Sequence, residues 1–592
     1  MSADTILHRL ANNARTRPNA PAYYEKQGQA WVPTSWQAYN GQVRQAAKAL
    51  IALGFQPGNI VTVLGFNTPE WVIVDLASML AGGAVAGIYT TNSPVECKYI
   101  VEHSESPIIL LENKSQWDKI KQVRDDIPTL KHIVMMRGNE VDDDMTMSWE
   151  QFLAQGNSIS DAQVDDSLDS LRPEQLATLI YTSGTTGPPK GVMLSHDNLA
   201  FTSDTSVPLL QLNANDSVLS YLPLSHIAEQ MFTIHTAITA GYQVYFAESL
   251  EKLADNLREV TPTVIFGVPR VWERFHAAVS ARLAEAHGAR AKIAAWAQDV
   301  GKKAWAEKHQ GRQPAGLLGL QYKLADRLVF SKLKPALGMT KVRHCITGAA
   351  PIQKEILEFF SGLDIPIYEV YGQSEDCGPT STNRPRATKY GTVGQAWPDV
   401  EVKIAEDDEI LVKGRNVFLG YYKNPQATAD DLQNGWLHSG DLGKFDSDGY
   451  LSIIGRKKEI MITAGGKNIA PKNIEAALKN VDLIAEAVII ADRRRFISAL
   501  VTLEPAALAK FAEENGLQGQ ANLHKNQAVI DAVQKGIDEK CNAHFARVEQ
   551  VRKFAILPRQ FTVEDGELTP TQKIKRRIIN QNWETEIESM YE

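Results

Sequence analysis

The sequence is poor in cysteine and has no excess of positive charge. Its 592 residues include four cysteines, which lie far apart and form no CxxC pair, and this argues against a disulfide scaffold and against a zinc ribbon. The 40 glycines and 27 prolines are too few and too scattered for a collagenous or disordered chain. The formal net charge of −8 argues against a dedicated nucleic-acid-binding protein.

Targeting signals and long hydrophobic runs are also scarce. The first residues contain no apolar core and no small-residue cleavage site, so no signal peptide is expected. The most apolar window, Trp71–Tyr89, contains Asp75 and is interrupted by Gly82 and Gly83. This pattern predicts a helix, a glycine turn and a buried strand in place of a membrane-spanning helix. We therefore expect a cytoplasmic protein, with peripheral contact at the inner face of a membrane as a further hypothesis.

Short segments rich in Val, Ile and Leu alternate with amphipathic helical segments. The predicted buried strands are 61–66, 132–136, 176–182, 263–269 and 344–350. Their alternation with helices such as 42–53 and 354–361 indicates an α/β fold. After about residue 400 the strands become shorter and more polar, which is typical of a small antiparallel sheet. The pattern restarts beyond the charged turn Gly455–Lys458, where we place a domain boundary.

The loop after the strand at 176–182 carries the most specific signal. It reads YTSGTTGPPKGVMLSH over Tyr181–His196. Glycines there permit backbone conformations that turn N–H groups toward an anion, the hydroxyls add donors, and a lysine adds a point charge. A Walker motif is absent, because Gly191 follows Lys190 where that motif requires Ser or Thr. The candidate phosphate-binding residues are Thr182, Ser183, Gly184, Thr185, Thr186, Gly187 and Lys190.

This loop resembles the phosphate-binding signature of the adenylate-forming superfamily, which includes acyl-CoA synthetases, luciferases and peptide-synthetase adenylation domains. Other motifs similar to that family's follow in order along nearly the whole chain: YLPLSHIAEQ, TGAAPI, YGQSE, GWLHSGDLG, GRKKEIMITAGGKNIAP and GELTPTQKIKR. Within the superfamily the chain resembles the bubblegum-type long-chain acyl-CoA synthetases, on the segments GVPRVWERF and CNAHFARVEQVRKFAILP and the helical insert between the motifs.

The resemblance implies an enzyme that activates a long-chain fatty acid with ATP and Mg²⁺, forms an acyl-adenylate, and transfers the acyl group to coenzyme A with release of AMP and pyrophosphate. It also implies a large N-terminal domain, residues 1–455, of α/β subdomains and a small antiparallel sheet. A hinge at 456–458 and a small mobile α+β C-terminal domain at 459–592 would follow. Lys458 would be the hinge residue, where relatives often carry Asp, and Gly465 and Gly466 would line the channel for coenzyme A.

The same resemblance assigns roles to individual residues. Tyr371 would offer an aromatic face to adenine, Asp441 would accept from both ribose hydroxyls, and Glu375 would hold Mg²⁺. Without the resemblance, the segment around Asp441 would be as typical of an ordinary turn as of a binding site. Ser374 and Ser439 stand where relatives commonly have Thr. The expected catalytic residues are Lys573, Glu375, His226 and Thr182. Besides the phosphate loop, the expected ATP- or AMP-binding residues are Gly348, Ala349, Ala350, Pro351, Glu369, Tyr371, Gly372, Gln373, Ser374, Asp441 and Arg456.

Two of these expectations reverse the ordinary interpretation of the residue. A lone histidine such as His226 is usually a core or capping residue, whereas the resemblance places it at the carboxylate end of the acyl pocket. There it would orient the substrate and would not act as a base, since a fatty acid is already ionised at neutral pH. Lys573 lies in a basic run that is otherwise typical of a solvated surface, and the resemblance makes it the cation that bridges the acyl carboxylate and the α-phosphate.

The predicted helical insert, residues 275–340, is basic within an acidic chain. It contains eleven Lys or Arg and four Asp or Glu, a formal charge of +7. Trp296, Trp305, Tyr322 and Phe330 occur among Leu and Ala at helical spacings. Basic helices with aromatic anchors can dock on an anionic membrane, although a solvated insert packed on the body of the protein is the favoured interpretation.

Other functions compatible with the motifs are loading of a carrier protein in place of coenzyme A, activation of an aryl or short-chain acid, and a catalytically inactive nucleotide-binding homologue. Intact Lys190, Glu375, Asp441, Arg456 and Lys573 argue against the inactive homologue. An unrelated ATPase or kinase is disfavoured because the Walker motif is absent.

Overall fold

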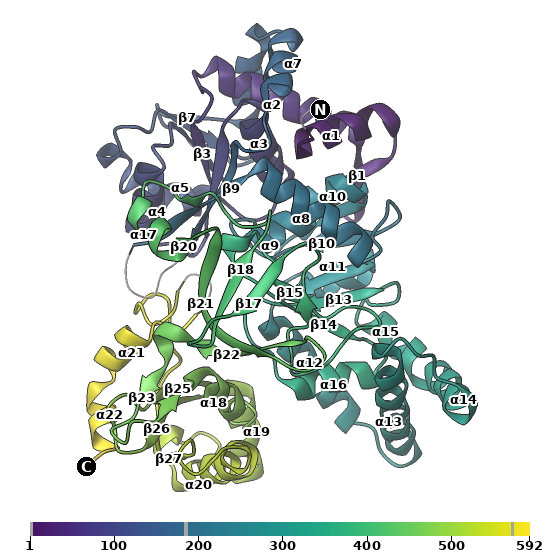
Figure 1. The fold of residues 1–592 in the computed structure, drawn as a ribbon, viewed down its shortest axis with the longest axis vertical. Coiled ribbons are helices and arrows are strands. Elements are labelled where there is room, and N and C mark those ends of the chain that lie inside the picture. The colour runs from purple at the N-terminus through teal and green to yellow at the C-terminus, as the bar shows by residue number, and fades with distance from the viewer. Residues whose placement is uncertain (1–3, 183–187, 570–572) are drawn as a thin grey trace.

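The computed structural model describes residues 4–182, 188–569 and 573–592 and has the predicted α/β architecture. Two large mixed sheets and a smaller antiparallel sheet form the greater part of the molecule, and the C-terminal segment forms a smaller unit beside them (Figure 1). The fold class expected from the sequence is confirmed.

The first large sheet has eight strands and contains the core of the N-terminal third. Its order is β19 (Gly420–Tyr421), β9 (Lys190–Ser195), β8 (Leu176–Thr182), β4 (Ala84–Ile88), β3 (Ile60–Leu64), β5 (Ile108–Leu111), β6 (His132–Met135) and β7 (Thr146–Met147). Strands β3, β4 and β5 are buried along their whole length, as parallel strands covered on both faces require.

The apolar window Trp71–Tyr89 folds as the sequence predicts. Thr68 caps α3 (Pro69–Leu80) by accepting from the N–H of Trp71, and every residue of this helix is buried. A turn at Gly82 then leads into β4. None of the described helices combines the length and the hydropathy needed to cross a bilayer.

The second large sheet has nine strands and supplies two of the segments that carry predicted site residues. Its order is β16 (Gln395–Ala396), β15 (Ser381–Thr382), β14 (Ile367–Tyr371), β13 (His344–Thr347), β12 (Val264–Gly267), β10 (Ser217–Ser220), β11 (Gln243–Phe246), β1 (Pro21–Gln27) and β2 (Ala30–Ser35). Strands β10 to β14 run parallel, so the loops after β13 and β14 leave the same edge.

The antiparallel sheet predicted after residue 400 has five strands. They are β17 (Glu401–Ile404), β18 (Glu409–Lys413), β20 (Leu432–Gln433), β21 (Trp436–Phe445) and β22 (Leu451–Arg456). Beyond β22 the chain forms the hairpin β23 (Met461–Ile462) and β24 (Asn468–Ile469) and the three-stranded sheet β25 (Ile484–Ile490), β26 (Ile497–Leu503) and β27 (Val551–Ile556).

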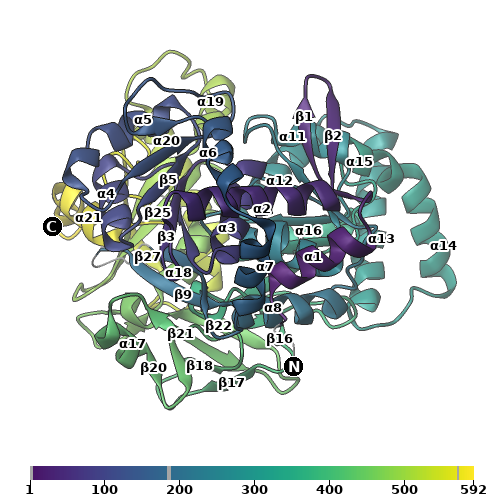
Figure 2. The ribbon, with the colours of Figure 1, turned by 90° about the horizontal axis from the view of Figure 1, so that it is seen from above.

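Helices cover the sheets, and in the basic segment α13 (Ala289–His309) and α14 (Gly316–Ala325) project at one side of the body (Figure 2). The basic segment, residues 275–340, contains the greater part of α12 (Pro269–Ala284), together with α13, α14, a π-helical turn at Asp326–Phe330 and α15 (Ser331–Ala336). The other principal helices are α1 (Ile6–Thr16), α2 (Trp36–Ala52), α4 (Pro94–His103), α5 (Lys114–Lys121), α6 (Trp149–Gln155), α7 (Asp161–Ser170), α8 (His196–Leu209), α9 (Ile227–Gln230), α10 (Thr236–Ala240), α11 (Leu253–Val260), α16 (Lys354–Gly362), α17 (Pro425–Asp431), α18 (Pro471–Leu478), α19 (Pro505–Glu514), α20 (Gln527–Gly536), α21 (Arg576–Asn582) and α22 (Glu584–Ser589).

Candidate active site

Tyr371, Asp441 and Arg456 meet where the nine-stranded and five-stranded sheets adjoin. Tyr371 ends β14, and Asp441 and Arg456 face each other in the register of β21 and β22. The Tyr371 hydroxyl donates to Oδ2 of Asp441 at 2.9 Å, and Nε of Arg456 donates to Oδ1 at 3.1 Å. Burial and the neighbouring carboxylate of Asp441 raise the pKa of Tyr371 well above its usual value, so the phenol stays a donor.

The loop after β13 forms an open edge beside Tyr371. Gly348 is buried, and a Cβ there would lie 2.8 Å from the carbonyl oxygen of Val370, so the close approach of the two strands requires glycine. Ala349, which has a φ of 67°, is exposed. The exposed residues that follow it are Ala350 and Pro351. This loop therefore presents three exposed residues beside the end of β14.

Glu369 of β14 pairs with Thr347, the last residue of β13 before this loop. It is 9% exposed, and its Oε2 has no partner among the described residues. Burial raises the pKa of Glu369 to about 8. A carboxyl group in this position is mostly protonated at neutral pH and can donate a hydrogen bond.

Glu375 is bound by a tyrosine that the motifs did not identify. The hydroxyl of Tyr421 lies 2.8 Å from Oε1 of Glu375 and 2.9 Å from Oδ2 of Asp431, and the Nζ of Lys190 lies 4.1 Å from the centre of the Tyr421 ring. Lys190 also pairs with Asp431 at 3.4 Å. Burial raises the pKa of Glu375 above its usual value, and the Tyr421 hydrogen bond opposes this shift. A sequence signal that could have identified Tyr421 is its place in the segment FLGYY, of which Gly420 and Tyr421 form β19.

The structure describes only part of the predicted phosphate loop. Thr182 ends β8, and its hydroxyl lies 3.5 Å from the carbonyl of Lys190, which begins β9. The structure thus brings the two ends of the loop together. Ser183, Gly184, Thr185, Thr186 and Gly187 lie outside the described residues.

The turn after β14 holds the remaining predicted nucleotide residues. A Cβ on Gly372 would lie 1.7 Å from the carbonyl oxygen of Gly378, so only glycine fits there. The backbone N–H of Gln373 donates to Oδ1 of Asp376 at 2.8 Å. Ser374 is buried at the start of the 3₁₀ turn that also carries Glu375.

Lys573 comes from the C-terminal segment and shares an electrostatic environment with the site. Desolvation and the positive charges of Arg456 and Lys472 lower the pKa of Lys573 to about 8, while Asp441 and Glu375 act in the opposite direction. The residue nevertheless keeps exposed surface. The charges of Arg456, Asp441 and Glu375 thus act on the pKa of the C-terminal lysine, as expected for a lysine near the predicted site.

His226 is a half-buried histidine whose pKa responds to the charge of Lys573. Its Nδ1 accepts from the N–H of Ala228 at 3.2 Å, so the side chain caps α9. Burial, with a contribution from the charge of Lys573, lowers the pKa of His226 to about 4. The imidazole is therefore neutral at neutral pH.

Three predicted residues lie outside this cluster of contacts. Lys458 is exposed in the short 3₁₀ turn after Arg456. Gly465 and Gly466 are exposed in the turn of the β23–β24 hairpin. Gly466 has a φ of 75°, and a Cβ there would meet no atom within 4 Å.

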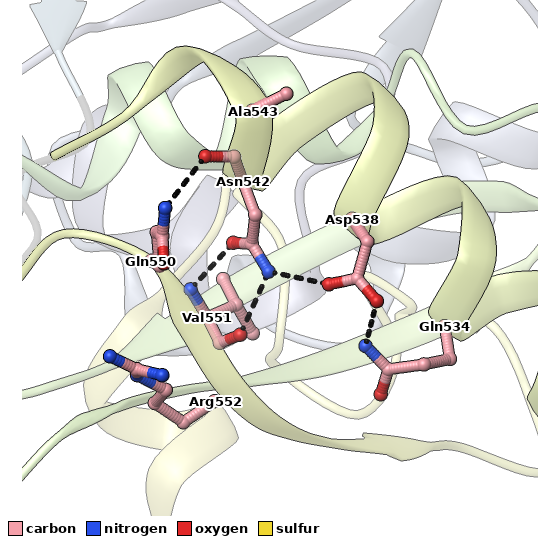
Figure 3. A pocket seen from close by; sticks show the side chains of 7 residues that line it. All are labelled: Gln534, Asp538, Asn542, Ala543, Gln550, Val551 and Arg552. Atoms are coloured by element: carbon pink, nitrogen blue, oxygen red, sulfur yellow. Dashed lines mark hydrogen bonds between the residues drawn. The ribbon is translucent and has the colours of Figure 1, made fainter. Parts of the chain in front are cut away.

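A cavity of about 380 Å³ lies on the C-terminal unit and contains none of the predicted site residues. Asn542, Asp538 and Gln534, which line it, hydrogen-bond to one another in a chain (Figure 3). Asn542 also exchanges hydrogen bonds with Val551, at 2.9 and 3.1 Å. These polar groups already satisfy one another, so the cavity does not replace the cluster around Asp441 as the candidate site.

Family models match both parts of the chain. Residues 10–422 match the model of AMP-binding enzymes, and residues 458–592 match that of the AMP-binding enzyme C-terminal domain. The long-chain-fatty-acid–CoA ligase ACSBG2 of Xenopus laevis is 40% identical, over 96% of this chain and 81% of that protein. ACSBG1 of Homo sapiens, also a long-chain-fatty-acid–CoA ligase, is 36% identical over 96% of this chain and 82% of that protein.

Solved structures share the fold at lower identity. The anthranilate CoA ligase AuaEII in complex with anthranoyl-AMP has a TM-score of 0.70 and 18% identity over 98% of both chains. The o-succinylbenzoate CoA synthetase MenE of Bacillus subtilis, in complex with ATP and magnesium ion, has a TM-score of 0.66 and 21% identity over 96% of this chain and 98% of that one.

Proposed function

Because the chain belongs to the family of AMP-binding enzymes, we propose that it is a long-chain fatty acid:CoA ligase. It would activate the acid with ATP, form an acyl-adenylate with release of pyrophosphate, and pass the acyl group to coenzyme A with release of AMP. The observation that carries the proposal is the contact of Asp441 with both Tyr371 and Arg456. The charges of Arg456, Asp441 and Glu375 also act on the pKa of Lys573. Relatives named as such ligases, at 35–40% identity over nearly the whole chain, support the substrate class.

Adenylate formation brings a carboxylate anion to a polyphosphate, so cations and fixed donors are the main requirement. In our proposal Lys573 bridges the acyl carboxylate and the α-phosphate, and Lys190 neutralises the phosphates from the other side. The loop residues 183–187 and Ser374 would add donors. The lysines lower the electrostatic barrier to bond formation between the acyl oxygen and phosphorus, and pyrophosphate leaves with the electron pair.

Tyr371 and Asp441 suit nucleotide recognition. The tyrosine ring would stack on adenine, opposite the loop of residues 348–351. Asp441 accepts from Tyr371 and Arg456 through different oxygens, and each oxygen keeps a further lone pair for a ribose hydroxyl. The protonated Glu369, at the base of the loop after β13, would add a hydrogen-bond donor to the nucleotide site.

The donor set fits a magnesium ion carried by the nucleotide. Among the described residues no cluster of three or more acidic, His or Cys side chains could by itself hold a metal. Mg²⁺ at nucleotide sites commonly needs one or two carboxylates, with phosphates and waters completing the octahedron. Glu375 would supply that carboxylate, with Tyr421 orienting it. The ion would neutralise phosphate charge.

The neutral state of His226 bears on its role. Since the acid substrate is ionised at neutral pH, no general base is needed for the first step. We propose that His226 orients the carboxylate and borders the acyl pocket. Its capping bond to Ala228 holds the ring at the start of α9.

In our proposal Lys573 serves the adenylation step, so the second step requires a different arrangement of the C-terminal unit. We propose that residues 459–592 rotate relative to residues 1–455 about the turn 456–458, with Lys458 as the hinge residue. The exposed turn at Gly465 and Gly466 would then line the approach of the coenzyme A thiol, where glycine leaves room for the pantetheine arm.

The cellular setting follows from the substrates and from the thiols. All four cysteines are buried and free. Free thiols fit a reducing compartment, and we propose a cytoplasmic enzyme. Its partners would be small molecules, namely the fatty acid, ATP and coenzyme A, without a nucleic acid.

The decisive experiment supplies ATP, Mg²⁺, coenzyme A and saturated acids of graded chain length to the purified protein and identifies products by mass spectrometry. Long-chain acyl-CoA together with AMP is the expected result. Acyl-adenylate without a thioester would indicate that a carrier protein is the acceptor. Absence of nucleotide turnover with every acid would contradict the ligase and support an inactive nucleotide-binding homologue.

A further inference from the structure

Helix α14 and the π-helical turn after it have two apolar faces, and only one of them is packed. Toward α13 the buried or half-buried residues are Leu318, Tyr322, Ala325, Val329 and Phe330. On the other face four leucines are solvent-exposed: Leu317 (72%), Leu320 (67%), Leu324 (48%) and Leu328 (37%). A helix that is apolar on opposite faces is typically covered on both, so the outer face lacks a covering surface. We call these four leucines the leucine stripe.

Cations without partners flank the leucine stripe. Lys323, Arg327 and Lys332 are exposed, and no ion pair engages them within the described part of the chain. Asp326 is the one exposed carboxylate from Gly316 to Ala336. Exposed leucines between unpaired cations complement a surface that is apolar inside and anionic outside.

The leucine stripe also has room to approach a flat surface. Both ribbon views place α14 at the periphery of the molecule, at the end of the helices that project from the body (Figures 1 and 2). The C-terminal unit, whose motion our proposed mechanism requires, lies on another side in Figure 1. A surface bound at α14 would therefore leave that unit free.

The aromatic residues do not serve as the membrane anchors suggested by the sequence. Phe330 is fully buried, and Trp296 packs in the same cluster. Trp305 donates to Oδ1 of Asp364 at 2.7 Å, and the Tyr322 hydroxyl also bonds to Asp364. The aromatic side chains thus hold the helices to one another and to the body, and the leucines form the exposed face.

We propose that the leucine stripe, with Lys323, Arg327 and Lys332, docks the protein on an anionic lipid membrane. The leucines would enter the boundary between headgroups and acyl chains, and the cations would pair with lipid phosphates. Docking would bring the enzyme to a phase in which long-chain acids concentrate, and this benefit rests on the proposed function. Binding itself does not depend on catalysis, so the two proposals can fail separately.

The test is flotation of the full chain, without substrates, on vesicles of phosphatidylcholine and of an equimolar mixture with phosphatidylglycerol. Two variants alter the surface: Leu317→Ser with Leu320→Ser and Leu324→Ser, and Lys323→Gln with Arg327→Gln and Lys332→Gln. A matched control removes three exposed cations of the C-terminal unit: Lys525→Gln, Arg547→Gln and Arg552→Gln. A second control removes an exposed apolar side chain elsewhere, Val548→Ser.

The wild type is expected to bind the mixed vesicles and to be released by high salt, since electrostatic attraction is screened. Each cation should contribute roughly fivefold, so the charge variant should bind about a hundredfold more weakly. The leucine variant should lose at least about tenfold, and both controls should bind like the wild type. Unchanged binding of both α14 variants, or absence of wild-type binding, would overturn the proposal. A wild-type dimer that the leucine variant converts to a monomer, without vesicle binding, would assign the stripe to a second copy.

Discussion

Asp441 and Arg456 face each other across β21 and β22, and the Nε of Arg456 donates to Oδ1 of Asp441 at 3.1 Å while Tyr371 donates to the other oxygen. One carboxylate therefore ties together the end of β14 and the last strand before the C-terminal unit. In the proposed enzyme this carboxylate also binds the ribose, so nucleotide binding and the position of the chain leading to that unit depend on the same side chain.

Asp441→Asn should weaken ATP binding more than it weakens fatty-acid binding. The amide keeps one acceptor but loses the charge that pairs with Arg456, and a hydrogen bond to a charged group contributes about 1.5–3 kcal/mol. We expect kcat/KM for ATP to fall about ten- to a hundredfold, with KM for the fatty acid nearly unchanged. Ser439→Ala, which removes an acceptor of the Asp441 N–H at 3.1 Å, is the milder control. Equal losses for both substrates would contradict the ribose assignment.

Lys573→Ala should separate the two half-reactions. In the proposed mechanism the lysine contributes to adenylate formation through its charge and should contribute little once acyl-adenylate is present. We expect ATP-dependent pyrophosphate release to be abolished, and thioester formation from supplied acyl-adenylate and coenzyme A to be retained. The neighbouring basic residue Lys575, tested as Lys575→Ala, serves as the control. A similar loss in both half-reactions would argue against two arrangements of the C-terminal unit.

The lowered pKa of Lys573 predicts a pH dependence. In the proposed mechanism the ammonium is the active form, and the lysine loses its proton as pH rises through about 8. Pyrophosphate release without coenzyme A should therefore show a kcat/KM for ATP that is level below this pH and falls above it, since this quantity reports the free enzyme. Lys573→Arg stays charged and should show a flatter profile at lower activity. A fall at the same pH in the arginine variant would assign the titration to another group.

Much of the fold and the identity of the candidate site residues could be predicted from local sequence. Continuous apolar runs marked β8 and β13, and the motifs marked Tyr371 and Asp441, because strands and turns are specified by neighbouring residues. Tyr421 was missed because its contact with Glu375 joins segments 46 residues apart, and no short motif contains both.

The basic segment shows a second limit of sequence patterns. Periodicity predicted helices there, but helices with apolar residues on two faces do not specify which face meets the body. Tyr322 turns inward because Asp364 accepts from its hydroxyl, and Leu320 is left outside. Asp364 lies on a distant segment, so only the tertiary structure identifies the exposed face.

Arg270 and Glu486 form an ion pair between α12 and β25. In the proposed mechanism this contact belongs to the arrangement that holds Lys573 at the adenylation site. Arg270→Ala should slow adenylate formation by about two- to fivefold, the range of a partly exposed pair. Thioester formation from supplied acyl-adenylate should be unchanged. Lys479, 3.5 Å from the same carboxylate, remains to neutralise Glu486. Lys479→Ala is the control, because it leaves the contact with α12. Loss of thioester formation in Arg270→Ala would contradict the assignment.

Two helical glycines predict opposite stability effects of the same substitution. In α13 a Cβ on Gly301 would lie 2.3 Å from the carbonyl oxygen of Gly362, so α13 and α16 would have to separate. We expect Gly301→Ala to lower the free energy of unfolding by about 1–3 kcal/mol. In α2 a Cβ on Gly41 would meet no atom within 4 Å. Gly41→Ala should therefore raise the free energy of unfolding by about 0.5–1 kcal/mol. Thermal unfolding of both variants at one scan rate gives the comparison. A Gly301→Ala midpoint at or above the wild-type value would show that the basic helices are not packed on α16 as closely as the Gly301–Gly362 approach requires.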